Sequence, residues 1–250
     1  MLKDLLHQTI QSTGFDIVRY RSPETRDIPP DASDGDRKII NSVKQDSLTS
    51  SERLLALIGA IRHLAQNNIP GAIAECGVWK GGSMMAAALA LIDEGDTTRE
   101  LFLYDTFEGM SEPTESDCSY DGMSAIAQLA ETPKGEGVWC YSSLDEVKTN
   151  LESTGYPTER IHYIRGKVED TIPANNPPPL AILRLDTDWY ESTKHELEHL
   201  FPLLVDDGFL IIDDYGHWQG ARKAVDEFLA ASPKKYFLHR IDNTGRLVIK

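Results

Sequence analysis

The sequence predicts an α/β fold, with a mostly parallel sheet, helices on both faces and an antiparallel hairpin at the C-terminal end. From residue 50 onward, short apolar runs alternate with helical patterns, which is typical of a parallel sheet. Residues 180–185 and 209–212 are apolar on both faces, as central parallel strands require. The turn-forming sequence Asn243-Thr244-Gly245 separates the last two apolar runs and favours a hairpin.

The order of elements follows from hydrophobic periodicity. Ser50 or Ser51 can cap a first helix, in which leucines and isoleucines recur with a 3.6-residue period. The expected strands are residues 72–74, 101–104, 161–164, 180–185, 209–212, 236–241 and 246–249. The expected later helices are residues 84–92, 144–151, 195–204 and 221–230.

Two segments stand outside this regular pattern. Residues 1–20 predict a short helix and an extended piece, and residues 21–37, rich in proline and acids, predict an irregular connector. We therefore expect an N-terminal arm or lid over residues 1–45 and one domain over residues 46–250. Residues 106–137 are rich in Gly, Ser, Pro and acids, with one helix near 123–130, and such a long loop is expected to cover a substrate.

Composition narrows the function. The formal net charge of −15 disfavours binding to nucleic acids or anionic membranes, because like charges repel. The N-terminus lacks the apolar stretch of a signal peptide, and no apolar run approaches the roughly 18 residues of a membrane span. Cys76, Cys118 and Cys140 are odd in number and widely spaced, which favours reduced thiols. We expect a cytoplasmic protein without membrane insertion.

A glycine-rich turn follows the first expected strand. Gly77 and Gly81 let the backbone approach a ligand closely, and Glu75 can accept hydrogen bonds from an ammonium group. Backbone amides at the start of the next helix can receive a carboxylate. A ligand that carries both groups is an amino acid, and S-adenosylmethionine (SAM) has such an end. A plain strand–helix turn is the alternative, and the dinucleotide fingerprint G-x-G-x-x-G is absent.

Acidic residues end three further strands. Asp105 ends the second strand, where an acid can bind both hydroxyls of a ribose or, alternatively, cap the next helix. Asp186 and Asp188 follow one very apolar strand, and Asp213 and Asp214 follow another, so four carboxylates are expected at one edge of the sheet.

The repulsion among these four carboxylates needs a partner. A divalent cation removes it, and oxygen ligands favour Mg²⁺, with Mn²⁺ or Ca²⁺ as alternatives. Taken singly, each aspartate could instead cap a helix, and His217 is an alternative ligand. On an extended chain Asp188 shares a side with Asp186, which makes Asp188 the candidate base for a metal-bound hydroxyl. Trp189, Tyr215 and Trp218 either form a wall for a ring-like substrate or pack in the interior.

Together these motifs resemble the macrocin O-methyltransferase family, which includes the mycinamicin and novobiocin sugar O-methyltransferases. The resemblance covers residues from about 48 to 228. Its markers are LTS at residues 48–50 with Arg53, ECGVWKGG at 75–82, YDTFEGM at 104–110, RLDTDWYEST at 184–193, and IDDYG at 212–216. It implies a Rossmann-like class I methyltransferase fold, SAM, Mg²⁺, and a deoxysugar whose vicinal hydroxyls chelate the metal.

The resemblance also implies residue roles. Asp186, Asp213 and Asp214 match the metal ligands, and Asp188 matches the general base. Together with the glycine turn, the resemblance gives the expected cofactor-binding residues as Thr49, Glu75, Gly77, Gly81, Ser83, Asp105, Ser143, Val168 and Asp186. Lys80 stands where arginine is usual, and residues 167–169 replace a more aromatic stretch. The first 40 residues and residues 111–137 match poorly, so the resemblance leaves the acceptor open.

The resulting prediction is a SAM-dependent, divalent-metal-dependent O-methyltransferase of natural-product biosynthesis. Its acceptor is expected to be a sugar hydroxyl of a glycosylated small molecule or a glycan, and the enzyme is expected to be a homodimer or homotetramer. One alternative is an O-methyltransferase of a catechol or another vicinal diol. Others are a nucleotide-binding Rossmann protein without methyl transfer or metal dependence, and a degenerate binding module of the same fold.

Overall fold

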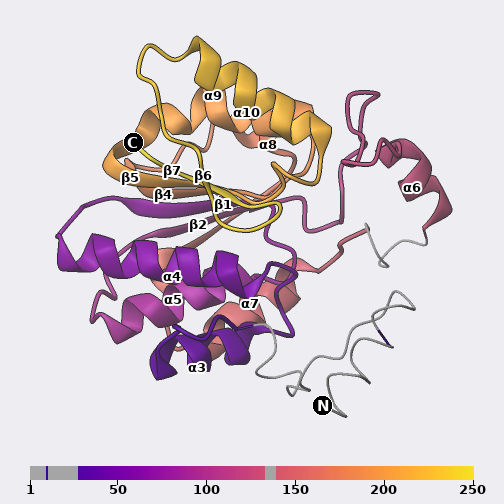
Figure 1. The fold of residues 1–250 in the computed structure, drawn as a ribbon. Coiled ribbons are helices and arrows are strands. Elements are labelled where there is room, and N and C mark those ends of the chain that lie inside the picture. The colour runs from indigo at the N-terminus through magenta and orange to yellow at the C-terminus, as the bar shows by residue number, and fades with distance from the viewer. Residues whose placement is uncertain (1–9, 11–27, 133–138) are drawn as a thin grey trace.

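A seven-stranded sheet organises the chain, in the order β3-β2-β1-β4-β5-β7-β6 (Figure 1). The computed structural model describes residues 10, 28–132 and 139–250. The strands are β1 (Ala72–Cys76), β2 (Leu101–Asp105), β3 (Ile161–Arg165), β4 (Leu180–Leu185), β5 (Leu204–Ile212), β6 (His239–Arg240) and β7 (Arg246–Ile249). β1 to β5 pair in parallel, and β7 pairs antiparallel with β5 and β6. The predicted fold class is confirmed.

Helices cover both faces of the sheet (Figure 1). One layer contains α3 (Asp34–Val43), α4 (Ser51–Gln66), α5 (Gly82–Asp93) and α7 (Leu144–Ser153). The other contains α8 (Val168–Thr171), α9 (Tyr190–His199) and α10 (Gln219–Ala231). Each layer buries its own apolar cluster against the sheet. α5 is apolar around nearly its whole surface because α3, α4 and α7 all contact it.

The strand order creates a crevice between β1 and β4. The chain leaves β1 toward one helical layer and β4 toward the other, and ligands bind at such a switch point, beyond the carboxyl ends of the strands. Hydrogen bonds continue the sheet past these ends, with the amide of Asp186 donating to the Cys76 carbonyl at 2.9 Å. Gly77 has φ +78°, and a Cβ there would lie 2.1 Å from the Asp186 carbonyl oxygen. Only glycine therefore lets these two strand ends approach so closely.

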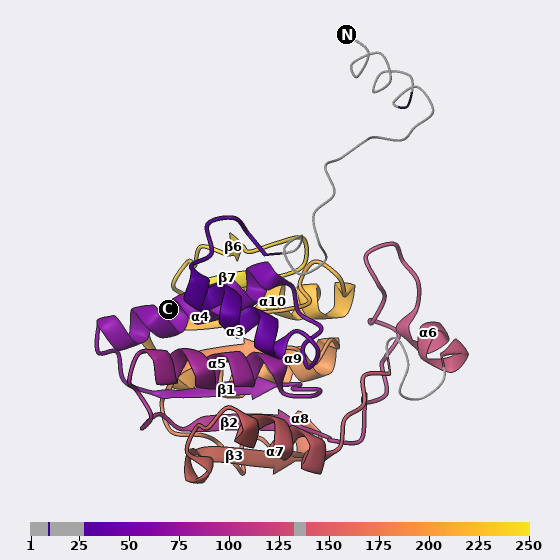
Figure 2. The ribbon, with the colours of Figure 1, turned by 90° about the horizontal axis from the view of Figure 1, so that it is seen from below.

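The long loop after β2 leaves the body of the fold and returns to it. Its helix α6 (Ala125–Glu131) stands away from the sheet in both views (Figures 1 and 2). The side chain of Asp117, which is fully buried, connects this loop to the starts of α9 and α10. Asp117 accepts hydrogen bonds from the backbone amides of Thr114 at 2.7 Å and Tyr190 at 2.8 Å. A Cβ at Gly220 would lie 2.1 Å from the Asp117 carboxylate, so the loop also touches the start of α10.

The N-terminal expectation was partly wrong. α3 begins at Asp34, inside the predicted irregular connector of residues 21–37. A capping box starts it, because the Ser33 hydroxyl accepts from the Asp36 amide and the Asp36 carboxylate accepts from the Ser33 amide. Ile39, Ile40 and Val43 of α3 are buried in the core beside α4 and α5. The helix and extended piece predicted for residues 1–20 lie outside the described residues, apart from Ile10, and the arm or lid stays a prediction.

Three other boundaries differ. The helix predicted at residues 195–204 is α9, which begins at Tyr190 and ends at His199, because the chain then turns through a 3₁₀ segment, Phe201–Leu203, that contains Pro202. β5 consequently starts at Leu204, earlier than predicted. The strand predicted at residues 236–241 is reduced to β6, an exposed edge strand of two residues. Among residues 28–132 and 139–250, no helix is long and apolar enough to cross a membrane.

Candidate active site

A cavity of ≈ 320 Å³ opens at the carboxyl ends of β1, β2, β4 and β5. It brings together most of the residues predicted from the sequence, although they come from five separate segments. The predicted residues that line it are Thr49, Glu75, Gly77, Ser83, Asp105, Asp186, Asp188, Asp213 and Asp214.

Glu75, the second-last residue of β1, has one carboxylate oxygen with a hydrogen-bond partner and one without. Its side chain is 1% exposed, Oε1 accepts a hydrogen bond from Arg184, and the buried Oε2 has no partner. Burial raises the pKa of Glu75 to about 7, although the Arg184 charge acts to lower it. A buried carboxylate oxygen without a donor is costly, so this position is suited to a ligand that donates hydrogen bonds.

Asp105 ends β2 and holds the backbone of two loops. Its Oδ2 accepts from the Val78 amide at 2.7 Å, and its Oδ1 accepts from the Phe107 amide at 2.7 Å. Burial raises the pKa of Asp105 even though these amides lower it. Oδ2 also accepts from the Trp79 amide at 3.3 Å, and Oδ1 also accepts from the Thr106 hydroxyl at 3.4 Å, so each oxygen already has two donors. These donors belong to loop residues and not to the next helix. A ribose would have to replace the two longer hydrogen bonds, and that role stays a prediction.

The remaining cofactor positions divide into packing and capping roles. Gly81 has φ +86°, and a Cβ there would lie 2.7 Å from Leu151 Cδ2, so glycine lets α7 pack on the turn. The Ser143 hydroxyl caps α7 by accepting from the Glu146 amide at 3.3 Å. Val168 begins α8 and lines a small cavity of ≈ 60 Å³ that it shares with Asp105. Cofactor contacts of these three residues remain predictions.

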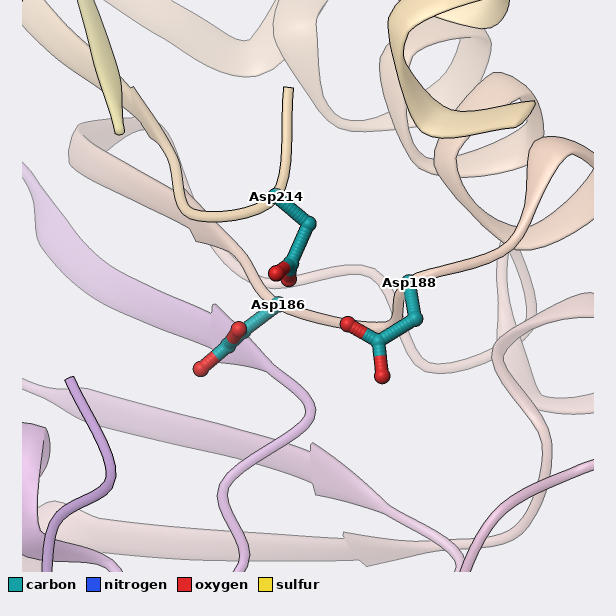
Figure 3. Close-up of side chains that lie close together, drawn as sticks. All are labelled: Asp186, Asp188 and Asp214. Atoms are coloured by element: carbon teal, nitrogen blue, oxygen red, sulfur yellow. The ribbon is translucent and has the colours of Figure 1, made fainter. Parts of the chain in front are cut away.

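Three carboxylates converge in the cavity. Figure 3 shows Asp186, Asp188 and Asp214 with their carboxyl groups grouped around a common space. One oxygen of each lies within 4.8 Å of the others. Burial and the neighbouring Asp186 raise the pKa of Asp214 to about 7, and its buried Oδ2 has no partner. Burial, with Asp214 as the next cause, holds the pKa of Asp188 well above its usual range. Such a cluster can hold a divalent cation.

Asp188 reaches this space by a turn and not by the extended chain assumed from the sequence. Its φ is +71°, in the left-handed region, and the amide of Trp189 donates to the Thr187 carbonyl at 2.8 Å. The expectation that Asp186 and Asp188 face one cavity holds, but the backbone conformation behind it is different.

Asp213 points into a different environment. Its carboxylate accepts hydrogen bonds from Arg53 and Arg184 and, at 2.9 Å, from the Thr49 hydroxyl. It is 5% exposed and lies outside the group of three converging carboxylates. Although predicted as a metal ligand, Asp213 is held here between two guanidinium groups.

Arg184 is the central residue that sequence reasoning missed. It lies on β4, is 2% exposed, and its guanidinium contacts Glu75, Asp213 and, at 2.7 Å, Asp186. Burial acts to lower its pKa, but Asp186 and Glu75 outweigh burial and raise the pKa. The signal was an arginine within an otherwise apolar buried strand, since a buried guanidinium needs carboxylate partners.

Aromatic residues and cysteines complete the lining. Trp189 and Trp218 are buried and pack edge-to-face at 4.9 Å between ring centroids, and Trp218 also lines the cavity. His217 lines the cavity too, and burial lowers its pKa. Burial, followed by Asp186, raises the pKa of Cys140 to about 11. Cys76, Cys118 and Cys140, which all lie among the described residues, form no disulfide with one another.

Comparisons of the sequence and of the structure with known proteins indicate the same family. The family model described as macrocin-O-methyltransferase (TylF) matches residues 26–249. The 8-demethyl-8-(2,3-dimethoxy-alpha-L-rhamnosyl)-tetracenomycin-C 4′-O-methyltransferase of Streptomyces olivaceus is 32% identical over 199 residues, which cover 80% of this chain and 73% of that protein. Demethyldecarbamoylnovobiocin O-methyltransferase of Streptomyces niveus is 31% identical over 196 residues, which cover 78% and 71%. The solved structure of the O-methyltransferase NovP matches with a TM-score of 0.70 and 26% identity, over 82% of each chain.

Proposed function

The chain belongs to the macrocin-O-methyltransferase family and is a SAM-dependent O-methyltransferase, and from this premise we propose that its acceptor is a sugar hydroxyl on a glycosylated small molecule. The name of the Streptomyces olivaceus relative specifies a rhamnosyl tetracenomycin, which supports a glycoside. The observation that carries the proposal is one cavity with unpartnered carboxylate oxygens on Glu75 and Asp214. These oxygens suit two ligands, an ammonium group at Glu75 and a cation at Asp214.

The chain's own residues bind the methyl donor at the β1 and β2 ends. Glu75 Oε2 accepts hydrogen bonds from the donor's ammonium group, and the amides at the start of α5 face its carboxylate. Asp105 accepts from the ribose hydroxyls in place of its two longer hydrogen bonds, those from the Trp79 amide and the Thr106 hydroxyl. Val168 adds an apolar contact in the small adjoining cavity. These contacts fix the donor so that the acceptor oxygen, methyl carbon and sulfur can align.

The carboxylate cluster fits a divalent cation, with Mg²⁺ as the first candidate and Mn²⁺ or Ca²⁺ as alternatives. Asp186 and Asp214 face the shared space directly. The family resemblance gives Asp213 as the third metal ligand, but its oxygens already form ion pairs with Arg53 and Arg184. Asp188, whose carboxylate faces the same space as Asp186 and Asp214, is the alternative third ligand. When bound, a cation here stabilises an alkoxide and orients the acceptor oxygen.

Asp188 is the proposed general base. It lies beside the acceptor space, and because its pKa is raised, its ionised form is a stronger base than an exposed aspartate. In the proposed reaction an oxygen–carbon bond forms and the carbon–sulfur bond of the donor breaks. The hydroxyl proton passes to Asp188 and then to solvent.

The test is transfer of a labelled methyl group from SAM to a panel of glycosides, free sugars and one catechol, in Mg²⁺ and in excess EDTA. We expect transfer to a glycoside that EDTA abolishes. Methylation of the catechol alone would replace the sugar as acceptor, and full activity in EDTA would remove the metal from the mechanism.

Variants separate the base from the ligands. Asp188→Asn should still bind S-adenosylhomocysteine (SAH) and Mn²⁺, but its kcat should fall by about a hundredfold or more. Asp213→Asn should weaken Mn²⁺ binding if Asp213 is a metal ligand. If Asp188→Asn loses Mn²⁺ binding and Asp213→Asn does not, Asp188 is the ligand and Asp213 is not. Asp206→Asn, at an exposed aspartate early in β5, is the matched control and should behave as wild type.

A further inference from the structure

Glu196 of α9 is a fully buried acid that the proposed mechanism does not use. Its Oε1 accepts a hydrogen bond from the Thr187 hydroxyl at 2.9 Å, and its buried Oε2 has no hydrogen-bond partner among the described residues. Burial is the largest cause that holds the pKa of Glu196 well above its usual range, although the Thr187 hydroxyl acts to lower it. A buried acid of this kind lowers stability, which points to a role for its hydrogen bond to Thr187.

Thr187 lies between the two acids that follow β4. Asp186 and Asp188 line the catalytic cavity, and their carboxylates face a common space with that of Asp214 (Figure 3). Thr187 directs its hydroxyl to Glu196 in the interior. Glu196 therefore holds the residue between the two acids and takes up none of the space that a ligand would occupy.

Asp186 is fixed by contacts that do not involve Thr187. Its amide donates to the Cys76 carbonyl at 2.9 Å, and its carboxylate accepts from Arg184 at 2.7 Å. Asp188 lies beyond the end of the strand, and its φ of +71° places its backbone in the left-handed region. A residue other than glycine is strained there and keeps this conformation only where its surroundings hold it. The Thr187 contact therefore matters most for Asp188.

The turn that carries Asp188 closes against the start of α9. The Trp189 amide donates to the Thr187 carbonyl at 2.8 Å, and the buried Ser192 hydroxyl donates to the Trp189 carbonyl at 3.2 Å. The Thr187 carbonyl and the Thr187 side chain are thus both held, the latter by Glu196 farther along the same helix. Two contacts on one residue fix its orientation, and the direction in which the chain enters Asp188 follows from it.

We propose that Glu196 is a positioning residue that acts through the Thr187 hydroxyl and holds the turn that directs the Asp188 carboxylate into the catalytic cavity. The inference rests on the proposed function only for the role of Asp188 as the base. The alternative is that Glu196 merely fills space in the interior. Its replacement would then change the stability of the whole fold and would not act on this turn in particular.

The first test is hydrogen exchange, measured by NMR, at the Trp189 amide of the turn and the Asp186 amide of the sheet. In Thr187→Val and in Glu196→Met, exchange at Trp189 should be about tenfold faster, the effect of one lost hydrogen bond, while exchange at Asp186 stays unchanged. Glu196→Gln, whose amide oxygen can still accept from Thr187, should recover most of the protection that Glu196→Met loses. Glu198→Gln, at an exposed glutamate of the same helix, is the matched control and should exchange as wild type does.

The double variant Thr187→Val/Glu196→Met separates the two roles of Glu196. If Glu196 acts through Thr187, exchange at Trp189 should be no faster in the double variant than in either single variant. Effects that add up in the double variant would overturn the proposal. So would equal acceleration at Trp189 and Asp186, which is the result expected of a packing residue.

Catalysis provides the second test. On any acceptor that the wild type methylates, Glu196→Met should lower kcat about tenfold and leave KM for SAM unchanged, because a displaced base slows proton removal but not donor binding. A wild-type kcat together with fast exchange at Trp189 would overturn the positioning role. If the wild type methylates no acceptor of the panel, the proposed function fails, and exchange at Trp189 still decides whether Glu196 holds the turn.

Discussion

Lowering the pH from 8 to 6 is expected to weaken Mn²⁺ binding by about tenfold or more, because a cation must displace protons from the carboxyls that hold it. Burial and Asp186 raise the pKa of Asp214 to about 7. Burial, followed by Asp214, places the pKa of Asp188 well above its usual range. The metal-free cluster therefore carries protons at neutral pH that a bound cation removes.

The magnitude follows from one titration. A carboxyl with a pKa of about 7 is about one-tenth ionised at pH 6 and about nine-tenths ionised at pH 8, so it contributes a factor of about ten in affinity, or ~1.4 kcal/mol. If Asp188 must also ionise, affinity falls by about a further tenfold for each pH unit below its pKa. The slope therefore counts whether one or two protons leave when the cation binds. Release of a second proton would mean that Asp188 also ionises, which both its role as a base and a role as a ligand require.

The assay is calorimetric titration of Mn²⁺ into the cofactor-free protein at pH 6, 7 and 8 and constant ionic strength, in buffers of different ionisation enthalpy. Those buffers report the protons released directly. Asp188→Asn should leave a one-proton slope, and Asp206→Asn should reproduce the wild-type slope. An affinity that is the same at pH 6 and pH 8, with no proton release, would refute the claim that the metal-free carboxyls are protonated.

Proton binding by these carboxyls should also affect the stability of the metal-free protein, which is expected to fall as the pH rises, whereas metal affinity rises. An aspartate in the unfolded chain has a pKa of about 3.9, so raised pKa values stabilise the fold below about pH 4, and this contribution is lost as the pH rises toward 7. Glu75 adds to the effect, since burial raises its pKa to about 7. The melting temperature of the metal-free protein should therefore be lower at pH 8 than at pH 6, and Mn²⁺ should restore more of it at pH 8.

Three substitutions test other parts of the site. Arg184→Met should lower the free energy of unfolding, measured in urea, by ~3–5 kcal/mol, because it leaves buried carboxylates without the Arg184 guanidinium. An unchanged urea midpoint would mean that these ion pairs contribute nothing to stability. Asp117→Ala should lower the melting temperature, because the Tyr190 amide at the start of α9 loses its buried acceptor, and should release the loop, with faster proteolysis within residues 106–132 and a higher acceptor KM. Wild-type proteolysis would count against the anchor. Gly77→Ala places a Cβ 2.1 Å from the Asp186 carbonyl oxygen at φ +78° and should cost ~1–3 kcal/mol and lower SAH affinity, whereas a neutral result would show that the strand ends can separate freely.

The fold was predictable because its strands are strongly marked. β4 and the second half of β5 are apolar on both faces, and only a sheet covered by two helical layers buries both. The strand-end acids were predictable for the same reason, since parallel strands deliver their carboxyl ends to one edge. α3 was harder to identify, because Gly35 and several acids conceal an amphipathic face that becomes clear once Ile39, Ile40 and Val43 are seen in the core.

The arrangement of the acids within the site was not predictable from their spacing. Asp213 and Asp214 are adjacent, yet one faces two arginines and the other faces two aspartates. That division depends on Arg53, which is distant in sequence, and on the left-handed backbone at Asp188. Periodicity carries information about which face a residue takes, but not about partners contributed by another helix.

The anchor of the long loop has a consequence for how ligands influence one another. Asp117 holds the Tyr190 amide, two residues after Asp188, and Cys118 holds the Gln219 amide, five residues after Asp214. The loop beside the acceptor space and both acid-bearing turns are thus fixed to the same two helix starts. If an acceptor that orders the loop changes metal affinity by some factor, the metal must change acceptor affinity by that same factor, because the coupling free energy is shared.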